Sequence, residues 1–431
     1  MTVEQAGPTQ RPASRVARLA KDPLTRTAWP LVLNTGTNGL LGVGYWVVAA
    51  RAYDVAAVGT NTALIAAMAT LSGISQLNLG PSLAVLLPRA GHTARRVLLG
   101  VYASVTAFSL VALATFIIVV LPHLSNLSAV LDSTSRTLLF AVAVLVFNIF
   151  ALQDAALVAL RWGKLVPVEN AAFGAAKLVL AIVLSTALPA FGIFVSWLLP
   201  MLVIVPVMST MVLIRAARAR PLDDRPPRRE PIRRLAMDYG GYLFQVSSTF
   251  FLPVVALELL DPVEAALFSV AWLTSSTLDL MATNVGTALT VETTYGEDPR
   301  QLRRTILRRA LPLVGVISFV GLVAAPLVLR VFGGEYSEHG TTTLQILLLA
   351  SVPRALVTFA IAEARAHRRM GVIVSLRAQN AVLALGLSVL LTPKMGVEGM
   401  AVAWLTAQVC GALSAWLQVW RRAPVVREGI A

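Results

Sequence analysis

The sequence predicts an all-α polytopic membrane protein with about 12 transmembrane helices, arranged as two six-helix bundles related by a pseudo-twofold axis along the membrane normal. Hydrophobic residues make up 57% of the 431-residue chain and charged residues only 13%. The apolar runs reach about 20 residues, the length that crosses a bilayer. A segment with eight arginines, residues 215–234, interrupts the apolar pattern at its midpoint. Since such a segment cannot enter lipid, we expect it to join two membrane bundles of similar length.

Apolar runs and their polar boundaries divide the chain into five parts. These are a cytoplasmic polar tail (1–27), an N-terminal six-helix bundle (28–214), a cytoplasmic basic linker (215–237), a C-terminal six-helix bundle (238–420) and a cytoplasmic tail (421–431). After the first span at 28–50 and a turn at 50–59, the second span reaches 79, and the others cover 97–121, 136–160, 167–188, 192–214, 238–260, 263–288, 305–329, 341–362, 371–391 and 396–420. A cleavable signal peptide is not expected, because about 27 polar residues precede a first run that is long enough to span.

The basic residues predict the orientation in the membrane. The two tails and alternate loops carry 29 of the 36 Lys and Arg residues, whereas the opposite loops carry four. By the positive-inside rule we expect a multi-pass protein of the cell (cytoplasmic) membrane with both termini in the cytoplasm. The net charge of +14 is thereby explained by short loops, and the basic residues form no continuous face for nucleic acid.

The two halves are related by a shift of 207 residues without a gap. The shift superimposes loops on loops and also pairs residues of the same type: Asp54 with Asp261, Arg161 with Arg368, Gly192 with Gly399, and Trp197 with Trp404. Because each half has an even number of spans, both repeats have the same topology. This arrangement predicts a transport site between the bundles, near the middle of the membrane.

Three cations inside predicted spans are the candidate substrate-binding residues: Lys177, Arg354 and Arg377. Lys177 lies near mid-bilayer, where an unpaired charge costs about 2.5 kcal/mol or more. Arg377 lies closer to the cytoplasm, so its side chain has the alternative of reaching the headgroups. Under the 207-residue shift Arg377 falls on Asn170, two helical turns before Lys177, so both cations belong to equivalent helix faces. We expect replacement of Lys177 or Arg377 by Ala to impair transport.

Two acids inside predicted spans and two charged residues at the ends of spans are further candidates for functional roles. Asp279 is a candidate for neutralising a cation or for coupling to protons or sodium, and Asp154 is expected to pair with Arg161 or a neighbour. Arg51 and Glu258 occupy the same repeat position with opposite charge, at the outer ends of their spans. They are candidates for a pair that closes an outer gate, with separate anchoring at the interface as the alternative.

Motifs for catalysis or metal binding are absent from the sequence. One cysteine, Cys410, excludes a disulfide framework, and the four histidines lack zinc-binding spacing. No P-loop, paired catalytic carboxylates or Ser/His/Asp set occurs. We therefore expect neither catalytic residues, cofactor nor metal site, and consider a membrane-embedded polysaccharide polymerase or ligase only as an alternative from another class.

The run GYWVVAARAYDVAAVGTNTALIAAMATLSGISQLNL (44–79) and the recurring LPAFGIFVSW and MGVEGMAVAW resemble the polysaccharide exporter and O-antigen flippase branch of the multidrug/oligosaccharidyl-lipid/polysaccharide exporter superfamily. The resemblance extends over about residues 28–422. It implies two six-helix bundles around a central cavity and a cargo that is commonly a glycan on polyprenyl pyrophosphate. Cavity cations placed like Lys177 and Arg377 are implied to bind the pyrophosphate, by position and not by motif.

These observations predict a transporter that flips a lipid-linked oligosaccharide, or exports polysaccharide, by alternating access. A cation-coupled multidrug exporter of the same superfamily is the alternative, which Asp279 supports and the buried cations oppose. The expected partners are the lipid-linked glycan, membrane lipids and the glycan polymerisation machinery, with no nucleic acid.

Overall fold

The computed structural model describes residues 23–219, 232–276, 308 and 310–421. Within these ranges the chain consists of helices and short connections, without any strand. The predicted all-helical class is therefore confirmed. Asp279 and the basic linker between 220 and 231 lie outside the described residues.

The described residues of the first half form eight α-helices with short 3₁₀ and π-helical turns. The α-helices are α2 (Pro23–Ala52), α3 (Val55–Ser75), α4 (Leu79–Arg89), α5 (Ala94–Thr115), α6 (Ser125–Val130), α7 (Thr134–Ala159), α8 (Leu165–Ala187) and α9 (Gly192–Ala217). The turns are η1 (Gly91–Thr93), η2 (Phe116–Val120) and η3 (Leu121–His123). The short helices α4 and α6 lie in segments that were expected to be loops.

Residues of the second half form α10 (Ile232–Thr249), α11 (Leu252–Leu259), a helix over 262–276, α14 (Leu311–Phe332), α15 (Gly334–Leu349), α16 (Ser351–Ala366), α17 (Met370–Met395), α18 (Val397–Ala415) and η5 (Trp416–Trp420). The span predicted at 238–260 is broken between Thr249 and Leu252. Pro253 explains the break, because it lacks the N–H that would continue the hydrogen bonds of α10.

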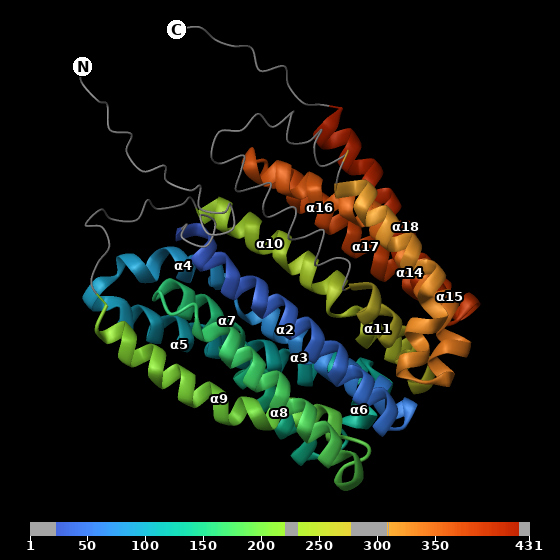
Figure 1. Ribbon diagram of the computed structural model, residues 1–431, viewed down its shortest axis with the longest axis horizontal. Helices are drawn as coiled ribbons and strands as arrows, with labels where there is room; N and C mark the ends of the chain where they lie inside the picture. The colour runs from blue at the N-terminus through green and yellow to red at the C-terminus, as the bar shows by residue number, and fades with distance from the viewer. Residues whose placement is uncertain (1–22, 220–231, 277–307, 309, 422–431) are drawn as a thin grey trace, which may run out of the picture.

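Ten helical segments of the described residues are long and apolar enough to cross a membrane. The remaining two predicted spans correspond to α2 and to the helix over 262–276. The two halves form two groups of helices, drawn blue to green for α2–α9 and yellow to red for α10–α18 (Figure 1). About 12 helices in two bundles therefore agree with the structure.

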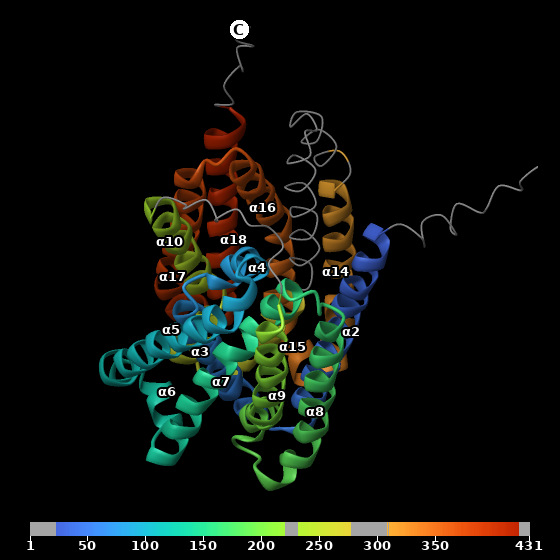
Figure 2. The same ribbon diagram turned by 90° about the vertical axis from the view of Figure 1, so that its left-hand side faces the viewer.

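Among the described helices, the bundles contact each other through α2, α3 and α6 on one side and α10, α11 and α14 on the other. Helix α2 packs on α8 of its own bundle and lies beside α14 of the other (Figure 2), and α3 packs on α11. The largest buried apolar cluster takes side chains from both bundles, among them Leu64, Phe194, Phe268 and Met400. We call the end that carries residues 52–54 and 260–262 the outer end, following the predicted orientation.

Repeat-related positions adopt the same local geometry. Arg161 and Arg368 both have left-handed backbones, with φ of 61° and 55°. Each follows the end of a helix that is closed by two backbone hydrogen bonds. In the first half, Arg161 N–H donates to the Val158 carbonyl and Trp162 N–H to the Leu157 carbonyl. In the second half, the repeat-related bonds run from Arg368 to Arg365 and from Arg369 to Ala364. The 207-residue repeat seen in the sequence is thus present in the fold.

A second repeat-related pair requires glycine. A Cβ on Gly192 would lie 2.9 Å from the carbonyl oxygen of Leu184, and one on Gly399 would lie 2.7 Å from that of Leu391. Leu184 and Leu391 are themselves 207 residues apart. Both turns therefore bring a helix start against the end of the preceding helix, at a distance only glycine permits.

Candidate functional site: two related pockets and an outer clamp

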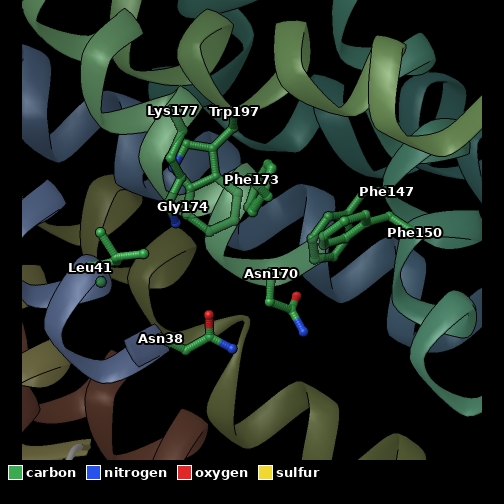
Figure 3. A pocket seen from close by; sticks show the side chains of 10 residues that line it. Asn38, Leu41, Phe147, Phe150, Asn170, Phe173, Gly174, Lys177 and Trp197 are labelled. Carbon is green, nitrogen blue, oxygen red and sulfur yellow. The ribbon is translucent and has the colours of Figure 1, made fainter. Parts of the chain in front are cut away.

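Lys177 on α8 is enclosed by aromatic rings. Its side chain is 8% exposed, and its Nζ lies 4.0 Å from the ring centroid of Trp197, 4.8 Å from that of Tyr45 and 5.0 Å from that of Phe173. Figure 3 shows the ring of Trp197 beside the lysine. The negative faces of aromatic rings attract an ammonium group, so the rings offset part of the cost of burying this charge. We call Tyr45, Phe173 and Trp197 the aromatic cage.

A small pocket of about 190 Å³ adjoins the aromatic cage within the N-terminal bundle. Its lining is mostly apolar, with Lys177 and two amides, Asn38 and Asn170, as the polar groups (Figure 3). Phe147 and Phe150 close the side formed by α7. The pocket offers one cation in an aromatic setting.

A larger pocket of about 680 Å³ lies in the C-terminal bundle and is strongly basic. Its described lining includes three arginines, Arg354 and Arg365 from α16 and Arg377 from α17, and one acid, Asp238. The guanidinium of Arg354 lies 4.9 Å from the ring centroid of Trp404, a geometry in which cation and ring attract. Amide side chains complete the lining: Asn78, Gln245, Asn380 and Gln408. An anion entering this pocket would meet several N–H donors and an excess of positive charge.

The two pockets are repeat-related copies. Eight of the ten residues that line the small pocket have partners 207 positions later in the lining of the large one. The pairs are Asn38 with Gln245, Leu41 with Ser248, Gly42 with Thr249, Phe147 with Arg354, Phe150 with Val357, Asn170 with Arg377, Phe173 with Asn380 and Trp197 with Trp404. In the C-terminal copy three aromatic residues and an amide are replaced by two arginines, a valine and an amide. The same fold therefore builds one aromatic pocket and one basic pocket.

The sequence-predicted cations fall into these two pockets. Arg354 and Arg377 share the large pocket, whereas Lys177 lines the small pocket and does not join them. Arg377 interacts electrostatically with Arg365, Asp238 and Tyr242. Its side chain lines the pocket in this structure. Of the two positions considered for Arg377, facing a cavity or reaching the headgroups, this is the first. Arg365 and Asp238 were missed, because both belong to segments near span ends where charges are ordinary.

Arg51 and Glu258 form no salt bridge with each other in this structure, and each binds backbone groups of the opposite bundle. Arg51 donates from Nε to the carbonyl of Val331 (2.7 Å) and from Nη2 to that of Arg330 (3.2 Å), both in the last turn of α14. These carbonyls accept no bond from within a helix, so a cation there is favourable. Arg51 thus attaches the N-terminal bundle to the C-terminal one.

Glu258 makes the reciprocal attachment. Its carboxylate accepts from the backbone N–H of Leu127 (2.7 Å) and of Asn126 (3.2 Å), and the Asn126 amide donates to the Leu257 carbonyl (2.6 Å). Arg51 therefore binds the last turn of the third span of the C-terminal bundle, and Glu258 binds the chain just after the third span of the N-terminal bundle. Arg51 binds two backbone carbonyls, whereas Glu258 binds two backbone N–H groups. This difference explains why the same repeat position carries opposite charges in the two halves. We call Arg51 and Glu258 with these targets the outer clamp.

Two acids lie on neighbouring helices of the N-terminal bundle, the half-buried Asp154 and the buried Glu169. Asp154 on α7 accepts from the Asn170 amide at 3.3 and 3.4 Å, so its described partner is Asn170 and not Arg161. Glu169 on α8 is 4% exposed, and neither carboxylate oxygen has a hydrogen-bond donor among the described residues. Glu169 was missed in the sequence, where it stands two residues inside a predicted span end. Among the described residues no group of three potential metal ligands occurs.

Comparison with known proteins identifies the fold. No family model and no curated protein matches the sequence. Among solved structures, an inward-facing multidrug resistance MATE family transporter of the MOP superfamily superposes with a TM-score of 0.65 at 16% identity, covering 91% of this chain and 96% of that one. An outward-facing transporter of that family gives 0.56 at 16% identity, covering 95% and 97%. A MOP superfamily transporter from Pyrococcus furiosus, described by the reverse polarity of its binding pocket, gives the same score, identity and coverage.

The chain therefore has the fold of MOP superfamily transporters. The match extends over nearly the whole length of each chain, so it includes both bundles. Two of the compared structures are described as transporters of this superfamily.

Proposed function

We propose that this protein is an alternating-access transporter for an amphipathic cargo with an anionic head group, best matched by a glycan on polyprenyl pyrophosphate. The observation that carries the proposal is the large pocket, where the described lining holds three arginines, Arg354, Arg365 and Arg377, and one acid, Asp238. Arginine presents a planar fork of N–H donors that suits phosphate oxygens, and such charge-assisted bonds are stronger than neutral ones. A pyrophosphate bound there would accept hydrogen bonds from these guanidinium groups.

The position of the pocket supports the same cargo. Asn78 and Pro81 of the N-terminal bundle complete a lining that otherwise belongs to the C-terminal bundle, so the pocket adjoins the boundary between the bundles. A head group bound there can cross with the rearranging bundles while its lipid tail stays in the bilayer. The outer clamp holds the outer end together in this structure, which leaves the inner end for entry.

A multidrug exporter is the second candidate, and the comparisons favour it. The inward-facing and outward-facing structures similar to this chain are multidrug resistance transporters. The aromatic cage adds no support to this candidate, because Lys177 lies between its three rings. Against it, a cationic drug in the large pocket would meet three arginines and one acid. The two candidates predict opposite substrate charge.

Binding of short lipid phosphates tests the proposal. Purified protein in detergent is titrated with farnesyl pyrophosphate, farnesol and tetraphenylphosphonium by calorimetry. We expect farnesyl pyrophosphate to bind far more tightly than farnesol, and Arg377→Gln to weaken it roughly ten- to hundredfold, the loss expected for a hydrogen bond to a charged group.

Arg136→Gln is the matched control, because Arg136 lies in the outer region, paired with Asp132 at 3.1 Å, and lines neither pocket. It should bind farnesyl pyrophosphate like the wild type. Tight binding of tetraphenylphosphonium without binding of the pyrophosphate would instead establish the multidrug exporter.

A further inference from the structure

The aromatic cage binds a cation that belongs to the protein itself. Lys177 Nζ lies between 4.0 and 5.0 Å from three ring centroids, within the distance at which an ammonium group is attracted to an aromatic face. The only salt bridge between described residues joins Arg136 and Asp132, so no described carboxylate pairs with Lys177. Its charge is compensated by ring faces.

The cage is held in shape independently of the lysine. The Tyr45 hydroxyl lies 2.9 Å from Ser196 Oγ and donates to the Ile193 carbonyl at 3.1 Å. Trp197 meets Tyr45 at an interplanar angle of 76° and Phe173 at 82°, both edge-to-face. Such packing fixes the three rings relative to one another. A cage of this kind is preorganised for a cation whether or not the lysine is present.

The position in the C-terminal bundle that corresponds to Lys177 carries no cation. That position is Ala384, which is fully buried. There the cation over the equivalent tryptophan, Trp404, comes instead from Arg354 on another helix. Each bundle therefore covers its repeat-related tryptophan with a cation of its own, from different helices.

We propose that the aromatic cage is an organic-cation site of the N-terminal bundle, permanently occupied by Lys177, and that Lys177 thereby excludes alkylammonium ligands from the protein. Removing the side chain beyond Cβ vacates the space between the three rings, and the adjoining pocket of about 190 Å³ gives room for the substituents of the ligand. A quaternary ammonium group then takes the place of the lysine, as in other aromatic cages. This site is separate from the arginine-lined pocket, so it does not depend on the proposed cargo.

Choline and its uncharged isostere 3,3-dimethyl-1-butanol test the proposal by calorimetry on purified protein. We expect the wild type to bind neither, and Lys177→Ala to bind choline at least tenfold more tightly than the wild type does, with no gain for the alcohol. Lys177→Met is the matched variant: it removes the charge but keeps an unbranched chain between the rings, so it should not bind choline.

Three outcomes would overturn the proposal. They are no gain of choline binding in a monodisperse Lys177→Ala protein, an equal gain for the alcohol, or an equal gain in Lys177→Met. Lys177→Ser vacates the cage in the same way and replaces Lys177→Ala if that variant aggregates. Farnesyl pyrophosphate binding at the large pocket is measured on the same samples, so failure of the cation site and failure of the proposed transport function give different results.

Discussion

Lys177 and Arg377 differ in surroundings although their helices are repeat-related. Lys177 was found in the sequence because it lies too deep to reach the headgroups, and the structure buries it among three rings. Sequence does not show those rings as neighbours, since Tyr45, Phe173 and Trp197 come from three helices. The prediction that Lys177 and Arg377 form one anion site is not supported by their separate pockets.

Glu169 carries a stability prediction. A buried carboxylate whose oxygens lack donors costs free energy as an anion, and Asp154 adds repulsion to it. Glu169→Gln removes the charge at nearly the same volume, so we expect it to raise the melting temperature of the purified protein.

Glu398→Gln is the control for this measurement, because Glu398 is exposed in the first turn of α18. It should leave the melting temperature nearly unchanged. A fall on Glu169→Gln would mean that the carboxylate holds a stabilising partner.

The outer clamp leads to a prediction about paired substitutions. Arg51 binds carbonyls and Glu258 binds N–H groups, so the charge reversals Arg51→Glu and Glu258→Arg each place the wrong charge against a backbone target. We therefore expect both single variants to lose transport and the double variant to show no rescue. Rescue by the double variant would contradict the clamp and support the direct pair expected from the sequence.

Gly59 on α3 provides a second test of the contact between bundles. A Cβ there would overlap the carbonyl oxygen of Pro262 and lie 2.8 Å from the nitrogen of Ala266, which is the repeat partner of Gly59. Gly100 on α5 has nothing within 4 Å. Glycine to alanine within a helix normally stabilises by about 1 kcal/mol.

We expect Gly100→Ala to raise the melting temperature and Gly59→Ala to lower it, because only the second forces the bundles apart. Equal stabilisation by both substitutions would show that α3 and the helix over 262–276 do not meet at this distance. The measurement is thermal unfolding of the purified variants under identical conditions.

Much of the helical architecture follows from sequence, because apolar length and basic loops report membrane spans directly. Two features were not predicted. The break at 250–251 lies next to Pro253. The short helix α6 is held by Glu258 of the other bundle, a contact that the sequence does not show. The repeat was visible as coincident Arg, Gly and Trp residues, but only the structure shows that it produces two pockets. The small pocket is aromatic and the large one basic, because Phe147 and Asn170 of the small pocket are replaced by Arg354 and Arg377 in the large one.

The molecule as a whole combines the fold of MOP superfamily transporters with a basic pocket next to the boundary between its bundles. Alternating access, which we propose for this protein, would present the pocket to each side in turn and would require the outer clamp to open. Transport, its direction and its cargo are predictions, as are the cytoplasmic location of both termini and any contact with glycan polymerisation machinery.

Flipping of a fluorescent polyprenyl-pyrophosphate oligosaccharide by the purified protein in liposomes tests these predictions together. The signal is the fraction of labelled lipid that becomes accessible to an enzyme added outside, with and without a proton or sodium gradient. We predict flipping by the wild type and by Arg136→Gln, and its loss in Arg377→Gln. Export of an organic cation by the wild type, with no flipping of the lipid under any gradient, would contradict the account.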